Sequence, residues 1–114
     1  ALARRKPTAH ARVLRVGGVE LDPLRRRARR DDLPLDLSTK EFSLLEALLR
    51  AAPGVLSAEE LLEEVWDEFA DPFTKTVQVT ISRLRRKLGD PDVIETVHGA
   101  GYRIRDSGDG PATS

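Results

Sequence analysis

Residues 75–88 carry basic side chains without a single acid among them. Five cations fall in this segment, although the whole chain balances 19 Lys and Arg against 19 Asp and Glu. A helix face that is only solvated usually mixes the two signs, because opposite charges four residues apart form ion pairs. A segment of one sign can instead donate hydrogen bonds to phosphate oxygens, and arginine can pair with guanine in a major groove. The segment therefore indicates non-covalent recognition of nucleic acid.

The apolar residues of the same segment predict how it is oriented. They recur at helical spacing and form one stripe, which we expect to face the core. Gly89 should end the helix, and Asp90-Pro91 should prevent its extension. The stripe consists of Val77, Ile81, Leu84 and Leu88.

The opposite side of this helix holds the candidate contact residues. Gln78 and Arg83 could read base edges through hydrogen bonds, and Val79 could contact a thymine methyl group. The alternative is a face that is only solvated, but such a face gives Val79 no role. Lys75, Val79, Ser82, Arg83 and Arg86 project outward, with Gln78 and Arg85 on one flank and Thr76 and Lys87 on the other.

A short β-meander is predicted at the start of the chain. Two β-prone runs flank Gly17-Gly18, a dipeptide suited to a two-residue hairpin turn. Residues 25–37 could add two more strands that turn at Asp31-Asp32. Pro34 would then lie on an edge or at a strand end, because proline cannot donate to a ladder.

Two helices are predicted between this meander and the basic segment. Ser38 and Glu41 have the spacing of a capping box, in which both side chains satisfy orphan amide donors. Ser57 and Glu60 repeat that spacing. The apolar positions at helical spacing are Phe42, Leu45, Leu48, Leu49 and Ala52 in the first helix, and Leu61, Leu62, Val65, Trp66 and Phe69 in the second.

The chain should close with a β-hairpin. Residues 93–105 predict a strand, a tight turn at His98-Gly99-Ala100-Gly101 and a second strand. The expected fold class is therefore α+β. It is a winged helix, with a short N-terminal β-meander, three helices and a C-terminal β-hairpin.

Length and composition bound the domain organisation. We expect one domain at residues 12–105, an interdomain linker or disordered terminus at residues 1–11 and a disordered tail at residues 106–114. The chain has no cysteine, which excludes disulfides and thiolate metal sites, and we expect neither a metal nor another cofactor. No apolar run approaches the ~20 residues that cross a bilayer. A soluble protein of the bacterial cytoplasm is expected.

The zero net charge is a sum of opposed blocks. Residues 1–30 hold ten cations and two acids, residues 31–71 two cations and twelve acids, and residues 72–105 seven cations and three acids. Net charge does not report where charges sit, and this pattern predicts a molecule with two differently charged faces.

Two stretches carry a family resemblance. They are LDLSTKEFSLLEALLRAAPGVLSAEELLEEVW at residues 35–66 and TVQVTISRLRRKLGDPDVIETVHGAGYRI at residues 76–104. Over about residues 13–105 the chain resembles the DNA-binding effector domain of OmpR/PhoB-type response regulators. The resemblance implies a helix-turn-helix variant with an N-terminal four-stranded antiparallel sheet, three helices and a C-terminal β-hairpin wing. It also implies control of transcription in a two-component system, with the helix at 75–88 in the major groove of DNA and the wing at 98–101 at the minor groove.

The resemblance also implies roles for single residues. Arg83 would reach bases, and Thr96 would meet a backbone phosphate. Phosphates would also be approached by Lys75, Thr76 and Arg86. The rest of the DNA-facing surface would consist of Gln78, Val79, Ser82 and Arg85 on the helix, and of His98, Gly99, Tyr102 and Arg103 on the wing.

Two positions depart from the family pattern. His98 stands at the wing tip, where the family commonly has an arginine. Neutral imidazole is a shorter and weaker attractor than guanidinium in a narrow groove, so His98 is either a groove contact or a turn residue. Ser82 replaces a residue that is often basic, and the base preference of a relative therefore cannot be transferred.

Further partners are implied by the resemblance. Residues 67–73 correspond to a segment that can touch RNA polymerase, and a plain connecting loop is the alternative. A receiver domain phosphorylated on Asp normally precedes such a domain, so we expect this chain to be a fragment of a longer protein. We expect the fragment to be monomeric by itself. The longer protein is expected to occupy tandem direct repeats on DNA. The polymerase-contact candidates are Asp67, Glu68, Phe69, Asp71 and Phe73.

Two other function classes are weighed against DNA binding. For an enzyme, His10, His98 and the acids of residues 59–68 could be imagined as a site. The four glutamates of residues 59–64 are better explained as the solvent face of a helix, because acids near a helix start are favoured by the helix dipole. No nucleophile with a base, phosphate loop or metal-ligand spacing occurs, so we expect no catalytic residue. A winged helix that binds only proteins is the second alternative, and the salt dependence of binding separates it from DNA binding.

Overall fold

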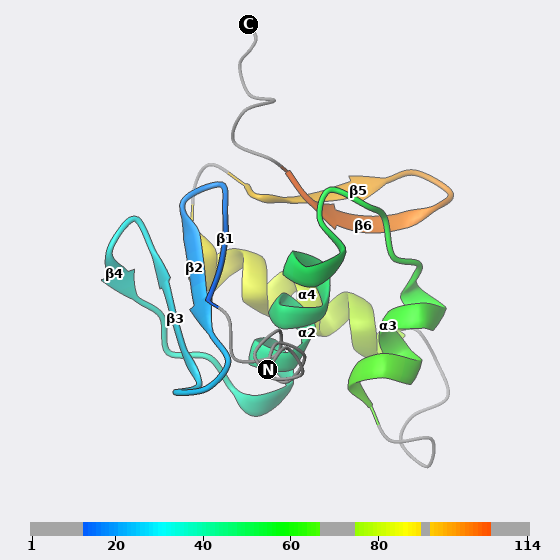
Figure 1. The fold of residues 1–114 in the computed structure, drawn as a ribbon. Coiled ribbons are helices and arrows are strands. Elements are labelled where there is room, and N and C mark those ends of the chain that lie inside the picture. The colour runs from blue at the N-terminus through cyan, green and yellow to red at the C-terminus, as the bar shows by residue number, and fades with distance from the viewer. Residues whose placement is uncertain (1–12, 67–74, 90–91, 106–114) are drawn as a thin grey trace, which may run out of the picture.

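The N-terminal sheet of this computed structural model has four antiparallel strands in chain order. The structure describes residues 13–66, 75–89 and 92–105. The strands are β1 (Leu14–Val16), β2 (Val19–Asp22), β3 (Arg27–Arg30) and β4 (Leu33–Pro34), and the sheet forms one side of the molecule (Figure 1). The predicted turns at residues 17–18 and 31–32 are confirmed, and Pro34 ends the edge strand as expected.

The two predicted capping boxes are both present. Ser38 Oγ accepts from the Glu41 backbone N–H, and the Glu41 carboxylate accepts from the Ser38 N–H at 2.9 Å. Ser57 and Glu60 make the same reciprocal pair, with a Ser57 N to Glu60 Oε1 distance of 2.8 Å. These boxes start α2 (Thr39–Ala51) and α3 (Ala58–Val65). The prediction that the second helix includes Trp66 is wrong, because α3 ends at Val65 and Trp66 is its C-cap with an extended backbone. Phe69, the last residue of that prediction, lies outside the described residues.

The basic segment forms α4 (Lys75–Leu88), which crosses the molecule from the α3 side to the sheet side (Figure 1). Its predicted apolar stripe is confirmed, since Val77, Ile81, Leu84 and Leu88 are buried. Gly89 ends the helix with a φ of 82°, a left-handed conformation that favours glycine, and its N–H donates to the Arg85 carbonyl at 3.0 Å. The cationic face is thereby turned away from the core.

The chain closes with a hairpin of β5 (Ile94–Val97) and β6 (Gly101–Ile104). The sequence placed Gly101 in the turn, but Gly101 is the first residue of β6 and pairs with Val97. A Cβ atom at Gly101 would lie 2.0 Å from the Leu56 carbonyl oxygen. The residue is glycine because the segment before α3 bridges to β6 here, with Leu56 and Tyr102 exchanging backbone hydrogen bonds of 2.8 and 2.9 Å.

The core lies around α2. This helix packs against α3, α4, β1 and β6. Leucines of α2 meet the stripe of α4 and the inward residues of both sheets, and Leu44, Leu45 and Leu48 are fully buried. The apolar core therefore contacts one side of α4, and the outer side is left to solvent.

Removing part of the α4 stripe should destabilise the fold. Leu84 is fully buried, so Leu84→Ala should lower the free energy of unfolding by about 2–5 kcal/mol. Leu33, which is 68% exposed, provides the control: Leu33→Ala should change it by less than about 0.5 kcal/mol. Urea denaturation followed by circular dichroism measures both. Equal effects of the two substitutions would contradict the packing described.

Candidate nucleic-acid interface

The outer face of α4 presents exposed cations. Lys75, Arg83 and Arg86 are exposed. Among the residues that the structure describes, none of these three takes part in an ion pair. Gln78, Val79 and Ser82 are exposed on the same helix, and Val79 retains 42% of its accessible surface. The structure thus brings together the outward set that the sequence predicted.

Arg85 joins this helix to the wing. Its guanidinium donates to the Ile94 carbonyl from Nε at 3.3 Å and from Nη2 at 3.0 Å, and Nη2 also donates to Thr96 Oγ1 at 2.6 Å. The guanidinium carbon lies 5.9 Å from the centre of the Tyr102 ring. Thr96 accepts here, so its own hydroxyl proton can still be donated outward. Arg85 and Thr96 therefore lie at one junction between α4 and β5.

The wing carries the remaining candidates. His98 and Gly99 are exposed in the turn between β5 and β6, and Thr96 is exposed on β5. Tyr102 is partly buried beside Arg85. Arg103 is partly buried and donates to the Glu95 carboxylate at 2.7 Å. Of the five predicted wing residues, Thr96, His98 and Gly99 thus face solvent. Tyr102 and Arg103 instead make contacts within the fold.

Two basic residues form ties that the sequence did not indicate. Lys87 Nζ donates to Glu41 Oε1 at 2.7 Å and to the Asp36 carbonyl at 2.9 Å. Arg30 is buried, and its Nη1 donates to the carbonyl of Leu88, the last residue of α4, and to the carbonyl of Gly89 just beyond it. Alternation along β3 was the available signal for Arg30, since Ala28 and Arg30 point inward. These cations hold the helix in place.

The carboxylate of Glu41 is the acidic partner in one of these ties. Burial alone raises the pKa of Glu41, but hydrogen bonds from Lys87 and from the Ser38 N–H outweigh burial and hold that pKa below its ordinary value of 4.5. The side chain is only 5% exposed. Glu41 therefore serves two helices at once, because it completes the capping box of α2 and binds the end of α4.

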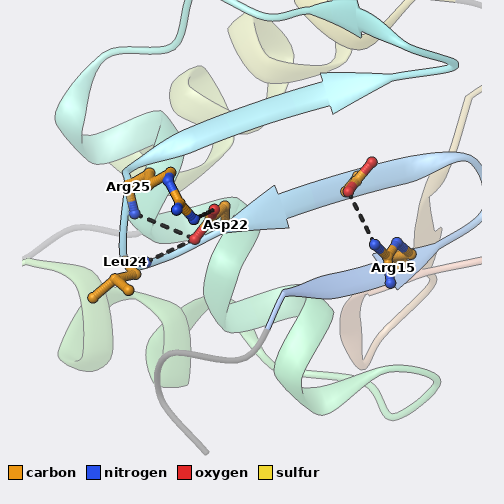
Figure 2. A network of polar contacts seen from close by, with 5 residues as sticks. Arg15, Asp22, Leu24 and Arg25 are labelled. Carbon is orange, nitrogen blue, oxygen red and sulfur yellow. Dashed lines mark hydrogen bonds and ion pairs between the residues drawn. The ribbon is translucent and has the colours of Figure 1, made fainter. Parts of the chain in front are cut away.

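Part of the N-terminal basic block is neutralised on the sheet (Figure 2). Arg15 donates to Glu20 at 3.2 Å, and Arg25 Nη1 donates to Asp22 at 3.1 Å. Asp22 also accepts from the backbone N–H groups of Leu24 and Arg25, at 3.1 and 3.2 Å. The contacts of Asp22 organise the connection from β2 to β3, and the Arg15–Glu20 pair joins β1 to β2. This network is separate from the outer face of α4.

Some predictions fall outside the described residues. They include the linker, the tail, His10 and the polymerase-contact candidates Asp67, Glu68, Phe69, Asp71 and Phe73. Within the described ranges, no set of three or more His, Cys, Asp and Glu side chains is arranged to hold a metal ion. In the same ranges, none of the helices combines the length and the apolar character needed to cross a bilayer.

The fold and this face define a winged helix of the DNA-binding class. A family model described as "Transcriptional regulatory protein, C terminal" matches residues 32–104. The chain belongs to this family, the effector domains of OmpR/PhoB-type response regulators. The family is a class of transcriptional regulators and is not an enzyme class.

Individual relatives agree with this assignment. The transcriptional regulatory protein CutR of Streptomyces coelicolor is 53% identical over 104 residues, which cover 91% of this chain and 48% of CutR. The DNA-binding domain of Klebsiella pneumoniae RstA, solved in complex with the RstA box, is 31% identical with a TM-score of 0.74, over 82% of this chain and 97% of that one. The response regulator DrrB, an OmpR/PhoB homologue of Thermotoga maritima, is 28% identical with a TM-score of 0.76. The match covers 91% of this chain and 50% of the DrrB chain. The chain spans about half the length of the curated relatives it matches.

The contact between Glu41 and Lys87 should make stability depend on pH. The pKa of Glu41 is lower in the folded state than in the unfolded state. The contribution of Glu41 to the free energy of unfolding is therefore present above about pH 4.5, and it is lost as the pH falls through the folded-state pKa. Glu41→Gln should therefore lower the free energy of unfolding by about 1–2 kcal/mol near neutral pH. This range allows for solvent screening of the ion pair, because the Lys87 side chain is 40% exposed. The difference from the wild type should shrink in acid.

Urea denaturation from pH 7 to pH 3 measures this difference. Glu64→Gln removes an exposed carboxylate of α3 without removing the contact, and it provides the control. A difference for Glu41→Gln that stays constant across this range would contradict the assigned role.

Proposed function

We propose that this chain binds double-stranded DNA in a sequence-specific manner, with α4 in the major groove. The observation that carries the proposal is the outer face of α4, where Arg83 and Arg86 are exposed and unpaired within the described residues. DNA can approach this face without breaking an ion pair, and Coulomb attraction to phosphates is then gained without a competing carboxylate. The buried stripe of α4 keeps the helix anchored while its other side binds.

The proposed roles divide the face into reading and positioning contacts. Arg83 donates to a base, because guanidinium matches the two acceptors of guanine. Lys75, Thr76 and Arg86 approach phosphates, which set the register on the duplex without reading sequence. Gln78, Val79, Ser82 and Arg85 line the same groove.

The wing is proposed to lie against the adjacent backbone and minor groove. Thr96 donates to a phosphate from the hydroxyl that accepts from Arg85. His98 and Gly99 enter at the minor groove from the turn. Tyr102 and Arg103 complete the wing surface, and Arg103 keeps its contact with Glu95 or exchanges it for phosphate.

The proposal extends to the longer protein from which such a domain comes. In that protein a receiver domain accepts the phosphorylation signal, and two copies occupy tandem direct repeats, while the fragment alone is monomeric. Residues 67–73 contact RNA polymerase. The chain performs no catalysis, and its DNA partner places it in the bacterial cytoplasm. The support for these statements is family membership, together with the half-length match to transcriptional regulators.

Selection of bound sites from random duplex DNA tests the proposal directly. A recurrent motif, bound more tightly than a scrambled duplex, is the expected result. The logarithm of the association constant should fall with the logarithm of salt concentration by about 0.9 for each neutralised phosphate. No enrichment and no salt dependence would favour a winged helix that binds only proteins.

Substitutions at Arg83 and Lys75 should separate reading from positioning. Arg83→Ala should lower the preference for the selected site over scrambled DNA by about 1–3 kcal/mol, because a base contact is lost. Lys75→Ala should weaken binding to both duplexes alike and reduce the salt slope by about one. Fluorescence anisotropy at several salt concentrations measures both effects. Equal losses on the two duplexes for Arg83→Ala would contradict its assignment as a reader.

A variant at the wing tip should decide the role of His98. His98→Arg should tighten binding to a selected site flanked by an A·T tract, whose narrow minor groove attracts guanidinium. His98→Ala should weaken the same binding if imidazole contacts the groove, and it provides the comparison. If neither variant changes affinity for the A·T-flanked duplex, His98 is only a turn residue.

A further inference from the structure

Arg30 occupies an inward position of β3. Along this strand Arg27 and Arg29 are exposed, whereas Ala28 and Arg30 are buried, and Arg30 keeps only 6% of its accessible surface. A buried guanidinium is costly unless partners satisfy it. The groups that accept hydrogen bonds from Arg30 therefore indicate its role.

These partners are at the end of α4. Nη1 of Arg30 donates to the Leu88 carbonyl at 2.9 Å and to the Gly89 carbonyl at 2.8 Å. The last carbonyls of a helix lack intrahelical donors and carry the negative end of its dipole. The guanidinium thus caps the C-terminus of α4 with charge-assisted hydrogen bonds.

A carboxylate contributes little to this arrangement. Within the described residues, Arg30 forms one ion pair, with Asp31, at 3.9 Å between Nε and Oδ2. The Asp31 side chain is 72% exposed, so water screens its charge. Nε of Arg30 is buried and has no hydrogen-bond partner among the residues that the structure describes. The cation is therefore stabilised mainly by the end of α4, and moving α4 away would leave it uncompensated.

The contact lies where it can steer the DNA-facing side chains. The sheet otherwise packs mainly on α2, and the C-terminal end of α4 reaches the sheet side of the molecule (Figure 1). Arg83 and Arg86 lie in the last two turns of α4. With a rise of 1.5 Å per residue, Arg83 is about 8 Å from Leu88 along the axis. A tilt of the capped end therefore moves both guanidinium groups relative to a bound duplex.

We propose that Arg30 is a positioning residue, which fixes the C-terminal half of α4 so that Arg83 meets its base in register. This inference rests on the proposed DNA binding. Arg30 itself touches no DNA, because it is buried. Its loss should therefore affect discrimination between sequences and leave phosphate attraction intact.

The experiment compares Arg30→Met, which keeps the apolar stem, with Arg30→Lys, which keeps a charged donor. Arg29→Met, at the exposed neighbour on the same strand, is the matched control with the same change of charge. Binding of the 114-residue chain is measured to a duplex with the selected site and to a scrambled duplex, at a temperature where all variants are folded. Amide hydrogen exchange at Gly89 is measured on the free protein.

Arg30→Met should reduce the ratio of selected to scrambled affinity about five- to tenfold, with an unchanged salt slope. Arg30→Lys should recover part of this ratio, and Arg29→Met should keep it. The Gly89 amide should exchange faster only in Arg30→Met, because the last turn of α4 has lost its cap. A general loss of stability would lower both affinities in proportion and leave their ratio unchanged.

Three results would overturn the inference. The first is an unchanged ratio in Arg30→Met. The second is a salt slope reduced by about 0.9, which would make Arg30 a phosphate contact. The third is an equal fall of the ratio in Arg29→Met. If the wild-type chain does not distinguish the two duplexes at all, the proposed function itself fails, and the Gly89 exchange still tests the cap.

Discussion

The arrangement depends on the burial of one side of α4. Its apolar stripe meets α2, and this contact keeps the cations of the helix, which lie outside the stripe, away from the core. Packing against the core requires an apolar side, and binding to DNA requires a charged side. One helix can provide both sides, because positions three or four residues apart lie on the same face. The other elements supply the core residues against which this side of α4 is buried.

Hydrophobic contact alone leaves a helix free to tilt, and polar ties limit this freedom. Arg85 binds β5, Lys87 binds the start of α2, and Arg30 of β3 binds the helix end. Each tie comes from a different element, so together they set the direction of α4. The cations of this domain therefore fall into two groups, and only those without a partner in the described residues are free to meet DNA at no electrostatic cost.

Local patterns account for what the sequence could predict. The capping boxes, the α4 stripe and the two sheet turns depend on residues a few positions apart, and each was predicted correctly. Gly101 was misplaced because the Leu56 backbone, far away in the chain, packs on it. Arg30 was counted only as a charge, and Lys87 only as a flank of the basic face, since their partners lie 58 and 46 residues away. The outward face of α4 was predicted, but the ties that orient it required the fold.

The most direct test of this account is a map of the surface that meets DNA. Adding the selected duplex to isotope-labelled protein should shift the NMR signals of the outer residues of α4 and of the turn at His98. The signals of Arg27 and Arg29, on the solvent side of β3, should stay nearly unchanged. Shifts concentrated on β3, with α4 unaffected, would contradict the claim that the unburied side of α4 is the surface that binds.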